Sequence, residues 1–229
     1  MNLEISSGAV TAQRLEQALR NAEFEPDSQN IWRWKSVTAS EAVIKFELLA
    51  DLDTQPAEAI IKFDGCQDLG AVNLRGTGLA TRDVEVRTLT AVDQGVLRKA
   101  EVNVAGLAGF LMAKAAAARS RRKPKDWYDI AFVLLHNDYG DASEAAARTK
   151  QVFGSEVISL RSTLTDLQAN FDGPEAQGTR AYVDQITLDD PVTDSATAAA
   201  DCQLAINTFC NILLNVSFGD EQRPPGEPG

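Results

Sequence analysis

The chain has 229 residues, of which 44% are hydrophobic, and its formal net charge is −11. This length and composition supply a core for one large domain or two small lobes, and no apolar run reaches the roughly eighteen residues that a membrane-spanning helix needs. The acidic balance argues against general nucleic-acid binding, because uniform negative charge repels phosphate.

Cysteine and histidine usage narrows the possible chemistry. Cys66, Cys202 and Cys210 form no CxxC pair or Cys/His cluster, and the first residues, MNLEISSGAVTAQ, lack the basic and apolar regions of a signal peptide. We therefore expect a cytoplasmic protein with neither disulfides nor a zinc site. His136 is the single histidine, and we expect it near a helix C-terminus, where a cation is favourable.

The first hundred residues predict one helix followed by strands. The helix is expected after a possible cap at Thr11, and the residues on its apolar face are Leu15, Ala18, Leu19 and Ala22. The expected strands are rich in Val, Ile, Phe and Trp and cover residues 31–37, 41–49, 57–63 and 84–89. The glycine-containing stretch 64–83 is expected to be a loop.

The remaining residues predict helices. An Ala-rich helix over 102–122 ends in basic residues, and Pro124 is suited to the first turn of a second helix over 124–136. Further helices are expected at 142–152, 155–171, 174–186 and 195–215. Within 175–218 this periodicity is the only signal.

These elements predict an α+β fold, in which a small mixed sheet flanked by helices is followed by a helical lobe. From the change in composition we expect an α/β lobe over residues 1–100 and a helical lobe over 101–218. The last segment, residues 219–229, has little to bury and is expected to be a disordered tail.

The stretch RRKPKDWYDI, residues 121–130, joins a basic run to two aspartates. Asp126 and Asp129 near the start of a helix favour its positive end, so simple capping is one interpretation. The other is an anion site, because cations at the end of one helix and free N–H groups at the start of the next both attract phosphate. Lys114, within the apolar part of the preceding helix, reaches either solvent or a cleft between the lobes.

The segments FLMAKAAA and RRKPKDWYDIAFVLL resemble the nucleotidyltransferase AbiEii/AbiGii toxin family of bacterial toxin–antitoxin and abortive phage-infection systems. The resemblance extends over roughly residues 10–170 and includes QRLEQALRNAEF, VIKFELL and VEVRTL. It implies a minimal nucleotidyltransferase lobe joined to a helical lobe. It also implies a transferase that moves a nucleotide from an NTP to a tRNA or protein acceptor with Mg²⁺, and that has a cognate antitoxin as partner.

The same resemblance assigns roles to residues of the basic junction. Lys114 and Asp126 would be catalytic, with Lys114 also contacting the phosphates of the bound nucleotide. Lys125 and Arg122 would assist in phosphate binding, and Asp129 would support the junction.

A metal-binding carboxylate is implied on a strand of the sheet, and Glu47 in VIKFELL occupies the matching place. Strand alternation leaves a second interpretation open, because Lys45 and Glu47 share one face and can pair there.

The family's glycine turn followed by D-x-D is missing before the first helix. Asp51 and Asp53 form a D-x-D, but they follow a strand without a glycine turn, so we interpret them as a strand-end loop. The chain is then either a shortened form whose start lies upstream or a variant impaired in catalysis. The alternative function is a non-catalytic protein of the same fold that binds an antitoxin-like partner.

Overall fold

The computed structural model describes residues 2–3, 9–38, 41–93 and 95–215. By their contacts the residues divide into two units, Met1–Asp126 and Trp127–Gly229. Strands occur in the first unit, whereas the described part of the second is helical. The fold is therefore α+β, with a mixed sheet followed by helices, as the sequence predicts.

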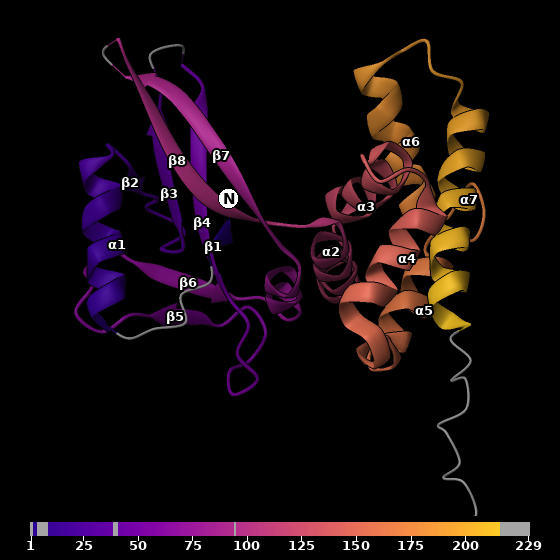
Figure 1. Ribbon diagram of the computed structural model, residues 1–229, viewed down its shortest axis with the longest axis horizontal. Helices are drawn as coiled ribbons and strands as arrows, with labels where there is room; N and C mark the ends of the chain where they lie inside the picture. The colour runs from indigo at the N-terminus through magenta and orange to yellow at the C-terminus, as the bar shows by residue number, and fades with distance from the viewer. Residues whose placement is uncertain (1, 4–8, 39–40, 94, 216–229) are drawn as a thin grey trace, which may run out of the picture. The chain divides into compact units, whose positions relative to one another are not determined.

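The first unit contains a mixed sheet (Figure 1). Its strands are β1 (Asn2–Leu3), β2 (Glu25–Pro26), β3 (Arg33–Val37), β4 (Val43–Ala50), β5 (Ile60–Lys62) and β6 (Gly70–Asn73). They follow the order β2-β3-β4-β6-β5, and β1 also pairs with β4. β4 is antiparallel to β3 and parallel to β1 and β6. Phe46 and Leu48 on one face of β4 are buried, and Glu47 between them lies on the other face.

Helix α1 (Ala9–Asn21) packs on this sheet. Ala12 and Leu19 join a core that is completed by Trp34, Phe46, Leu48, Leu69 and Ala71. The predicted apolar face is partly wrong, because Ala18 and Ala22 are exposed and Glu16 is buried. The helix also begins at Ala9, so Thr11 lies inside it.

The stretch 64–83, expected as a loop, contains β6 and the 3-10 helix η1 (Thr77–Arg82). All four residues of β6 are buried, since β6 pairs with β4 on one side and β5 on the other. A short strand buried on both faces shows no hydrophobic alternation, which explains why the sequence pattern missed it.

Strands β7 (Val84–Asp93) and β8 (Val96–Ala105) form a separate antiparallel hairpin (Figure 1). Its register runs from Val84 opposite Ala105 to Asp93 opposite Val96. Gly95 adopts a φ of 80° at the turn, a conformation that glycine favours. The helix expected from residue 102 is therefore wrong at its start, because residues 102–105 pair with β7.

Helix α2 (Leu107–Arg121) packs on η1 and belongs to the first unit, so the unit boundary lies beyond the one expected at residue 100. The Asp83 carboxylate accepts hydrogen bonds from the backbone N–H groups of Ala108 and Gly109, at 2.9 and 3.3 Å, and so caps the helix from outside. A Cβ atom on Gly109 would lie 2.9 Å from the Ala80 carbonyl oxygen. Glycine thus permits the close contact between α2 and η1.

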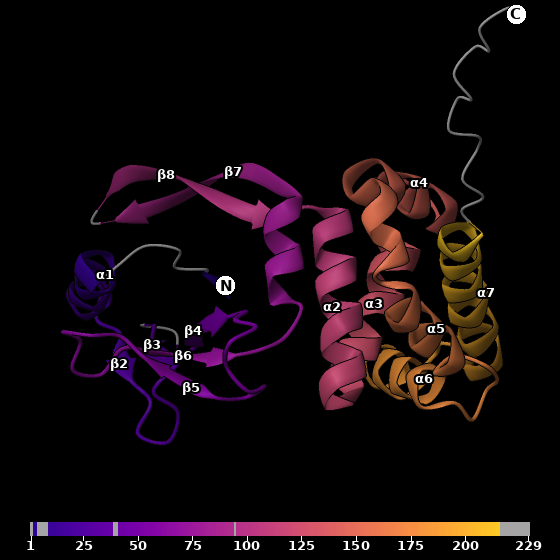
Figure 2. The ribbon, with the colours of Figure 1, turned by 90° about the horizontal axis from the view of Figure 1, so that it is seen from below.

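In the second unit, several helices pack against the last one. The elements are α3 (Pro124–His136), whose first residues belong to the first unit, α4 (Ala142–Phe153), η2 (Gly154–Ile158), α5 (Arg161–Ala169), α6 (Gln177–Asp189) and α7 (Ser195–Leu214). α7 packs against α4, α5 and α6 (Figure 2). The single helix expected over 155–171 is instead η2 followed by α5. The tail expected over 219–229 lies outside the described residues.

Candidate functional site

The corner between α2 and α3 brings three charged side chains together. Lys114 and Arg121 are seven residues apart on α2, so two helical turns place them on the same face. Arg122 ends α2 in a left-handed conformation with a φ of 52°, and Pro124 then starts α3. This tight change of direction brings Asp126, in the first turn of α3, back toward α2.

Asp126 accepts hydrogen bonds from both cations. Arg121 forms a bidentate pair with it, since Nε lies 2.7 Å from Oδ2 and Nη2 lies 2.7 Å from Oδ1. Lys114 Nζ lies 3.2 Å from Oδ1. The Asp126 side chain is 2% exposed, whereas those of Lys114 and Arg121 are 23% and 25% exposed. We call these three residues the Asp126 cluster; it has one buried negative charge and two partly exposed positive charges.

The cluster keeps Asp126 ionised. Burial raises the pKa of this carboxyl, but the hydrogen bonds and charges of Arg121 and then of Lys114 outweigh burial and hold the pKa below its ordinary value. The hydrogen bond to Asp126 raises the pKa of Arg121, and the charges of Glu47 and Glu58 contribute in the same direction. The cluster therefore has a net charge of about +1 at neutral pH.

The structure thus joins two of the sequence-predicted residues, Lys114 and Asp126, and adds Arg121. Sequence reasoning did not select Arg121 from the basic run, although its seven-residue spacing from Lys114 was the available signal. Arg122 and Lys125 are exposed at the same corner, and Asp129 is half-buried in α3.

Glu47 is paired across the sheet. It lies opposite Arg33 of β3, and the Arg33 Nε atom donates a hydrogen bond of 2.6 Å to Glu47 Oε1. Of the two interpretations left open for Glu47, pairing with Lys45 is replaced by pairing with Arg33 on the neighbouring strand. Within the described ranges, no three His, Cys, Asp or Glu side chains lie close enough to hold a metal ion.

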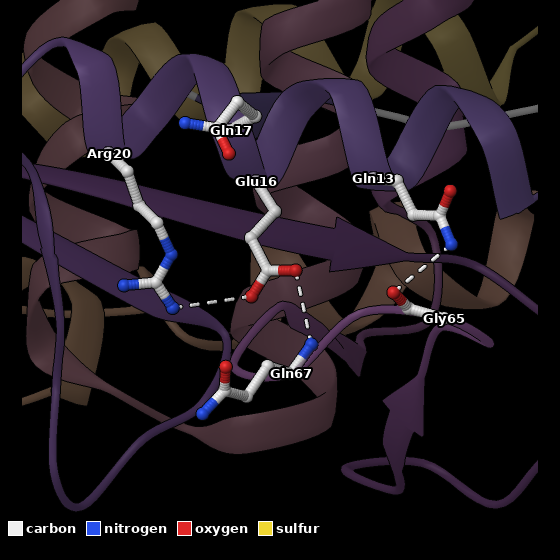
Figure 3. Close-up of a pocket in the computed structure, with 6 residues that line it drawn as sticks. All are labelled: Gln13, Glu16, Gln17, Arg20, Gly65 and Gln67. Carbon is white, nitrogen blue, oxygen red and sulfur yellow. Dashed lines mark hydrogen bonds and ion pairs between the residues drawn. The ribbon is translucent and has the colours of Figure 1, made fainter.

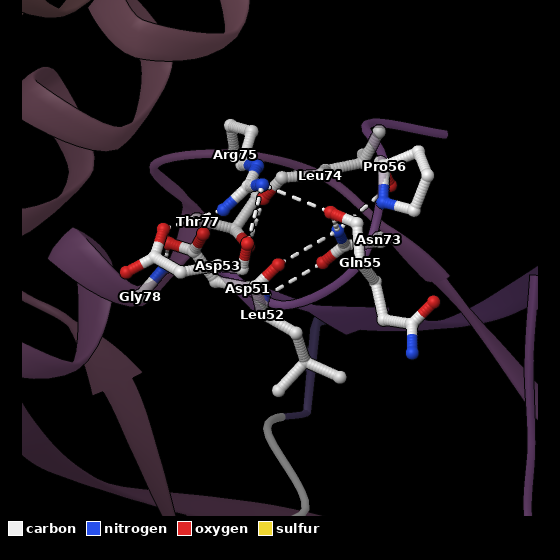
Figure 4. Close-up of polar contacts among 10 residues, drawn as sticks. All are labelled: Asp51, Leu52, Asp53, Gln55, Pro56, Asn73, Leu74, Arg75, Thr77 and Gly78. Atoms are coloured by element: carbon white, nitrogen blue, oxygen red, sulfur yellow. Dashed lines mark hydrogen bonds and ion pairs between the residues drawn. The ribbon is translucent and has the colours of Figure 1, made fainter. Parts of the chain in front are cut away.

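The D-x-D of residues 51–53 lies in the loop after β4, as the sequence predicts (Figure 4). Asp51 accepts a hydrogen bond of 2.9 Å from the Gly78 backbone N–H, and Asp53 pairs with Arg75. The buried Asn73 organises the loop, because its amide nitrogen donates to the carbonyl oxygens of Leu52, Gln55 and Pro56. Both aspartates thus take part in contacts that stabilise the loop.

A polar hollow of about 350 Å³ lies between α1 and the loop before β6 (Figure 3). The buried Glu16 carboxylate accepts hydrogen bonds from the backbone N–H groups of Gln67 and Asp68, at 3.1 and 2.7 Å. The Gln13 amide donates to the Gly65 carbonyl oxygen at 3.1 Å. These contacts attach the loop to α1 and explain why a glutamate occupies its buried face.

The described helices include none with the length and apolar character needed to cross a bilayer. Comparison of the chain with protein-family models, with curated proteins and with solved structures found no match.

Proposed function

We propose that the chain is a nucleotidyltransferase-like protein in which the Asp126 cluster binds the phosphates of a nucleoside triphosphate. The observation that supports this proposal is the pairing of one buried carboxylate with two cations that remain partly exposed. The carboxylate fixes the positions of the cations, while both cations keep part of their surface exposed to solvent, where an anion can approach them. The resemblance of FLMAKAAA and RRKPKDWYDI to AbiEii-type toxins supports the same conclusion.

The proposed reaction is nucleotidyl transfer to a tRNA or protein acceptor. A hydroxyl oxygen of the acceptor attacks the α-phosphorus, a new P–O bond forms, the α–β phosphoanhydride bond breaks, and pyrophosphate leaves with the bonding electrons. The acceptor hydroxyl loses its proton to solvent. Lys114 and Arg121 would stabilise the negative charge that develops on the pyrophosphate, and Asp126 would act as a positioning residue.

Magnesium, which the family resemblance implies, would neutralise phosphate charge in such a reaction. The described carboxylates do not fit a magnesium site in this arrangement, because Asp126 is paired with Arg121 and Lys114, and Glu47 is paired with Arg33. The roles assigned to Lys114, Arg121 and Asp126 therefore concern nucleotide binding and charge stabilisation.

Nucleotide binding tests the proposal directly. We expect ATP or GTP to bind the wild-type chain in calorimetric titrations, and Lys114→Ala to weaken binding by about tenfold or more, as loss of a charge-assisted contact does. This variant retains the Arg121–Asp126 pair, and circular dichroism checks that it is folded. Lys62→Ala removes an exposed lysine from β5 and is the matched control. Wild-type affinity in Lys114→Ala, or no binding by the wild type, would contradict the proposal.

Transfer requires a separate assay. With an NTP labelled at the α-phosphate, we expect label to enter an RNA or protein acceptor slowly, with pyrophosphate released in equal amount, because the glycine turn and D-x-D of the family are missing before the first helix. Nucleotide binding without transfer would support a binding role and remove the catalytic one.

The second candidate is a non-catalytic protein of the same fold that binds an antitoxin-like protein. The pairing of Asp126 with two cations favours it, since ion pairs of this kind also serve to hold helices together. In that case partner binding persists in both Lys114→Ala and Asp126→Ala, and no nucleotide dependence is seen. A partner complex that weakens in Lys114→Ala would count against this candidate.

A further inference from the structure

The β7–β8 hairpin exposes large apolar side chains on both faces. Val86, Leu89, Val92 and Leu97 are 63%, 54%, 72% and 60% exposed. In the described part of the chain, β7 and β8 pair with each other and with no further strand. An isolated two-stranded ribbon is marginally stable in water, and adding strands stabilises it. Pairing with a further strand would therefore stabilise the hairpin.

The outer edge of β8 is the place where pairing can extend. An edge strand offers backbone N–H and C=O groups to another strand, and natural proteins protect such edges with charges that oppose unwanted partners. β8 carries Lys99 and Glu101 on one face, because residues two apart in a strand point to the same side. A strand pairs favourably with this edge where it places opposite charges across from Lys99 and Glu101.

A second copy of the same strand fits this edge. When two β8 strands pair antiparallel around a twofold axis at Ala100, Lys99 of each copy lies opposite Glu101 of the other. On the other face, Val96 of each copy lies opposite Val104 of the other. Both opposite-charge pairs and apolar pairs at these positions stabilise antiparallel strands.

The neighbouring twofold registers are unfavourable. An axis at residue 99 places Lys99 opposite its own copy, and an axis at residue 101 does the same for Glu101. Like charges directly opposite each other destabilise a sheet, so the charge order favours the axis at residue 100 over both of its neighbours. We propose that the chain forms a homodimer in which the two β8 strands pair around Ala100, so that both hairpins build one four-stranded sheet.

Charge reversal tests this interface in the full-length chain. Sedimentation analysis over a range of concentrations should show a monomer–dimer equilibrium for the wild type. Lys99→Glu places two Glu–Glu pairs in the interface and Glu101→Lys places two Lys–Lys pairs, so each variant should dimerise about tenfold more weakly or worse. An equimolar mixture of the two variants restores two opposite-charge pairs and should form a heterodimer.

The double variant Lys99→Glu with Glu101→Lys exchanges the charges and should dimerise like the wild type. Lys62→Glu makes the same charge change on exposed β5 and should leave dimerisation unchanged. Circular dichroism confirms that each variant is folded. A monomeric wild type, a dimer insensitive to Lys99→Glu, or a mixture that stays monomeric would each overturn the proposal; a monomeric wild type that instead binds a different protein through the hairpin would assign this edge to that partner.

Discussion

Replacing Asp126 with asparagine removes the buried negative charge while the shape of the side chain is kept. Removing one partner of a buried ion pair costs about 3–5 kcal/mol. The Asp126 side chain is 2% exposed, but those of Lys114 and Arg121 are 23% and 25% exposed, so water partly solvates the cations that remain. We therefore expect the free energy of unfolding to fall by about 2–3 kcal/mol, at or below the lower end of that range.

Urea unfolding followed by tryptophan fluorescence measures this loss, because the buried Trp34 and Trp127 report on the two units. Asp138→Asn changes an exposed aspartate after α3 and is the control; we expect it to alter stability by less than about 0.5 kcal/mol. A loss in Asp126→Asn as small as that of the control would refute a stabilising role for the cluster.

The pH dependence of this loss follows from the pKa of Asp126. Burial raises the pKa, but Arg121 and Lys114 lower it further, so in the folded protein it lies below the ordinary value of 3.8. The stabilisation by the carboxylate is therefore complete above 3.8 and disappears as the pH falls through the folded pKa. The difference between wild type and Asp126→Asn should be equal at about pH 7 and pH 5 and should shrink in more acidic solution. A difference that stays constant into strong acid would show that the lost charge is not its cause.

Three further changes test the packing of both units. Asp83→Ala removes the cap of α2 and should lower the free energy of unfolding by about 1–2 kcal/mol in urea unfolding, whereas an unchanged midpoint would exclude the capping role. Gly109→Ala should destabilise by about 1–3 kcal/mol in the same assay, because its Cβ would lie 2.9 Å from a carbonyl oxygen of η1; a gain in stability would mean that helix propensity dominates. Burial raises the pKa values of Cys202 and Cys210 to about 12, so mass spectrometry should find native alkylation at Cys66 first, and early labelling of either buried thiol would contradict this order.

The helices with clear boundary residues were the most predictable part of the fold. Helix α3 occupies Pro124–His136, as expected, because proline favours the first turn and the apolar residues keep a helical period. The end of β8 was not predictable in this way, since VNVA runs directly into an Ala-rich helix. Only the pairing with β7 determines that residues 102–105 are extended.

The α1 helix shows a second limit of sequence patterns. Alanine is small enough for either environment, so Ala18 and Ala22 were assigned to the buried face although both are exposed. Glu16 was not expected to be buried, because its partners are backbone N–H groups more than fifty residues away along the chain. Contacts between residues so far apart in the sequence leave no signal in the pattern of neighbouring residues.

The candidate site was predictable where its residues lie close together in the sequence. Lys114 and Asp126 were selected from their motifs, and the structure pairs them directly. The arginine partner of Glu47 was not expected, because it depends on the register between β3 and β4. Strand register is a property of the assembled sheet, so a charge pattern within β4 alone does not identify the partner.

Both ends of α2 are fixed by carboxylates that lie outside the helix. At the start of α2, the Asp83 carboxylate accepts hydrogen bonds from two backbone N–H groups. Toward the end of α2, Asp126 pairs with Lys114 and Arg121. A cation on a helix held at both ends loses little conformational freedom when it binds an anion, which favours affinity. If the proposed nucleotide site is correct, Asp83→Ala should therefore weaken nucleotide binding although Asp83 lies at the opposite end of α2 from Arg121.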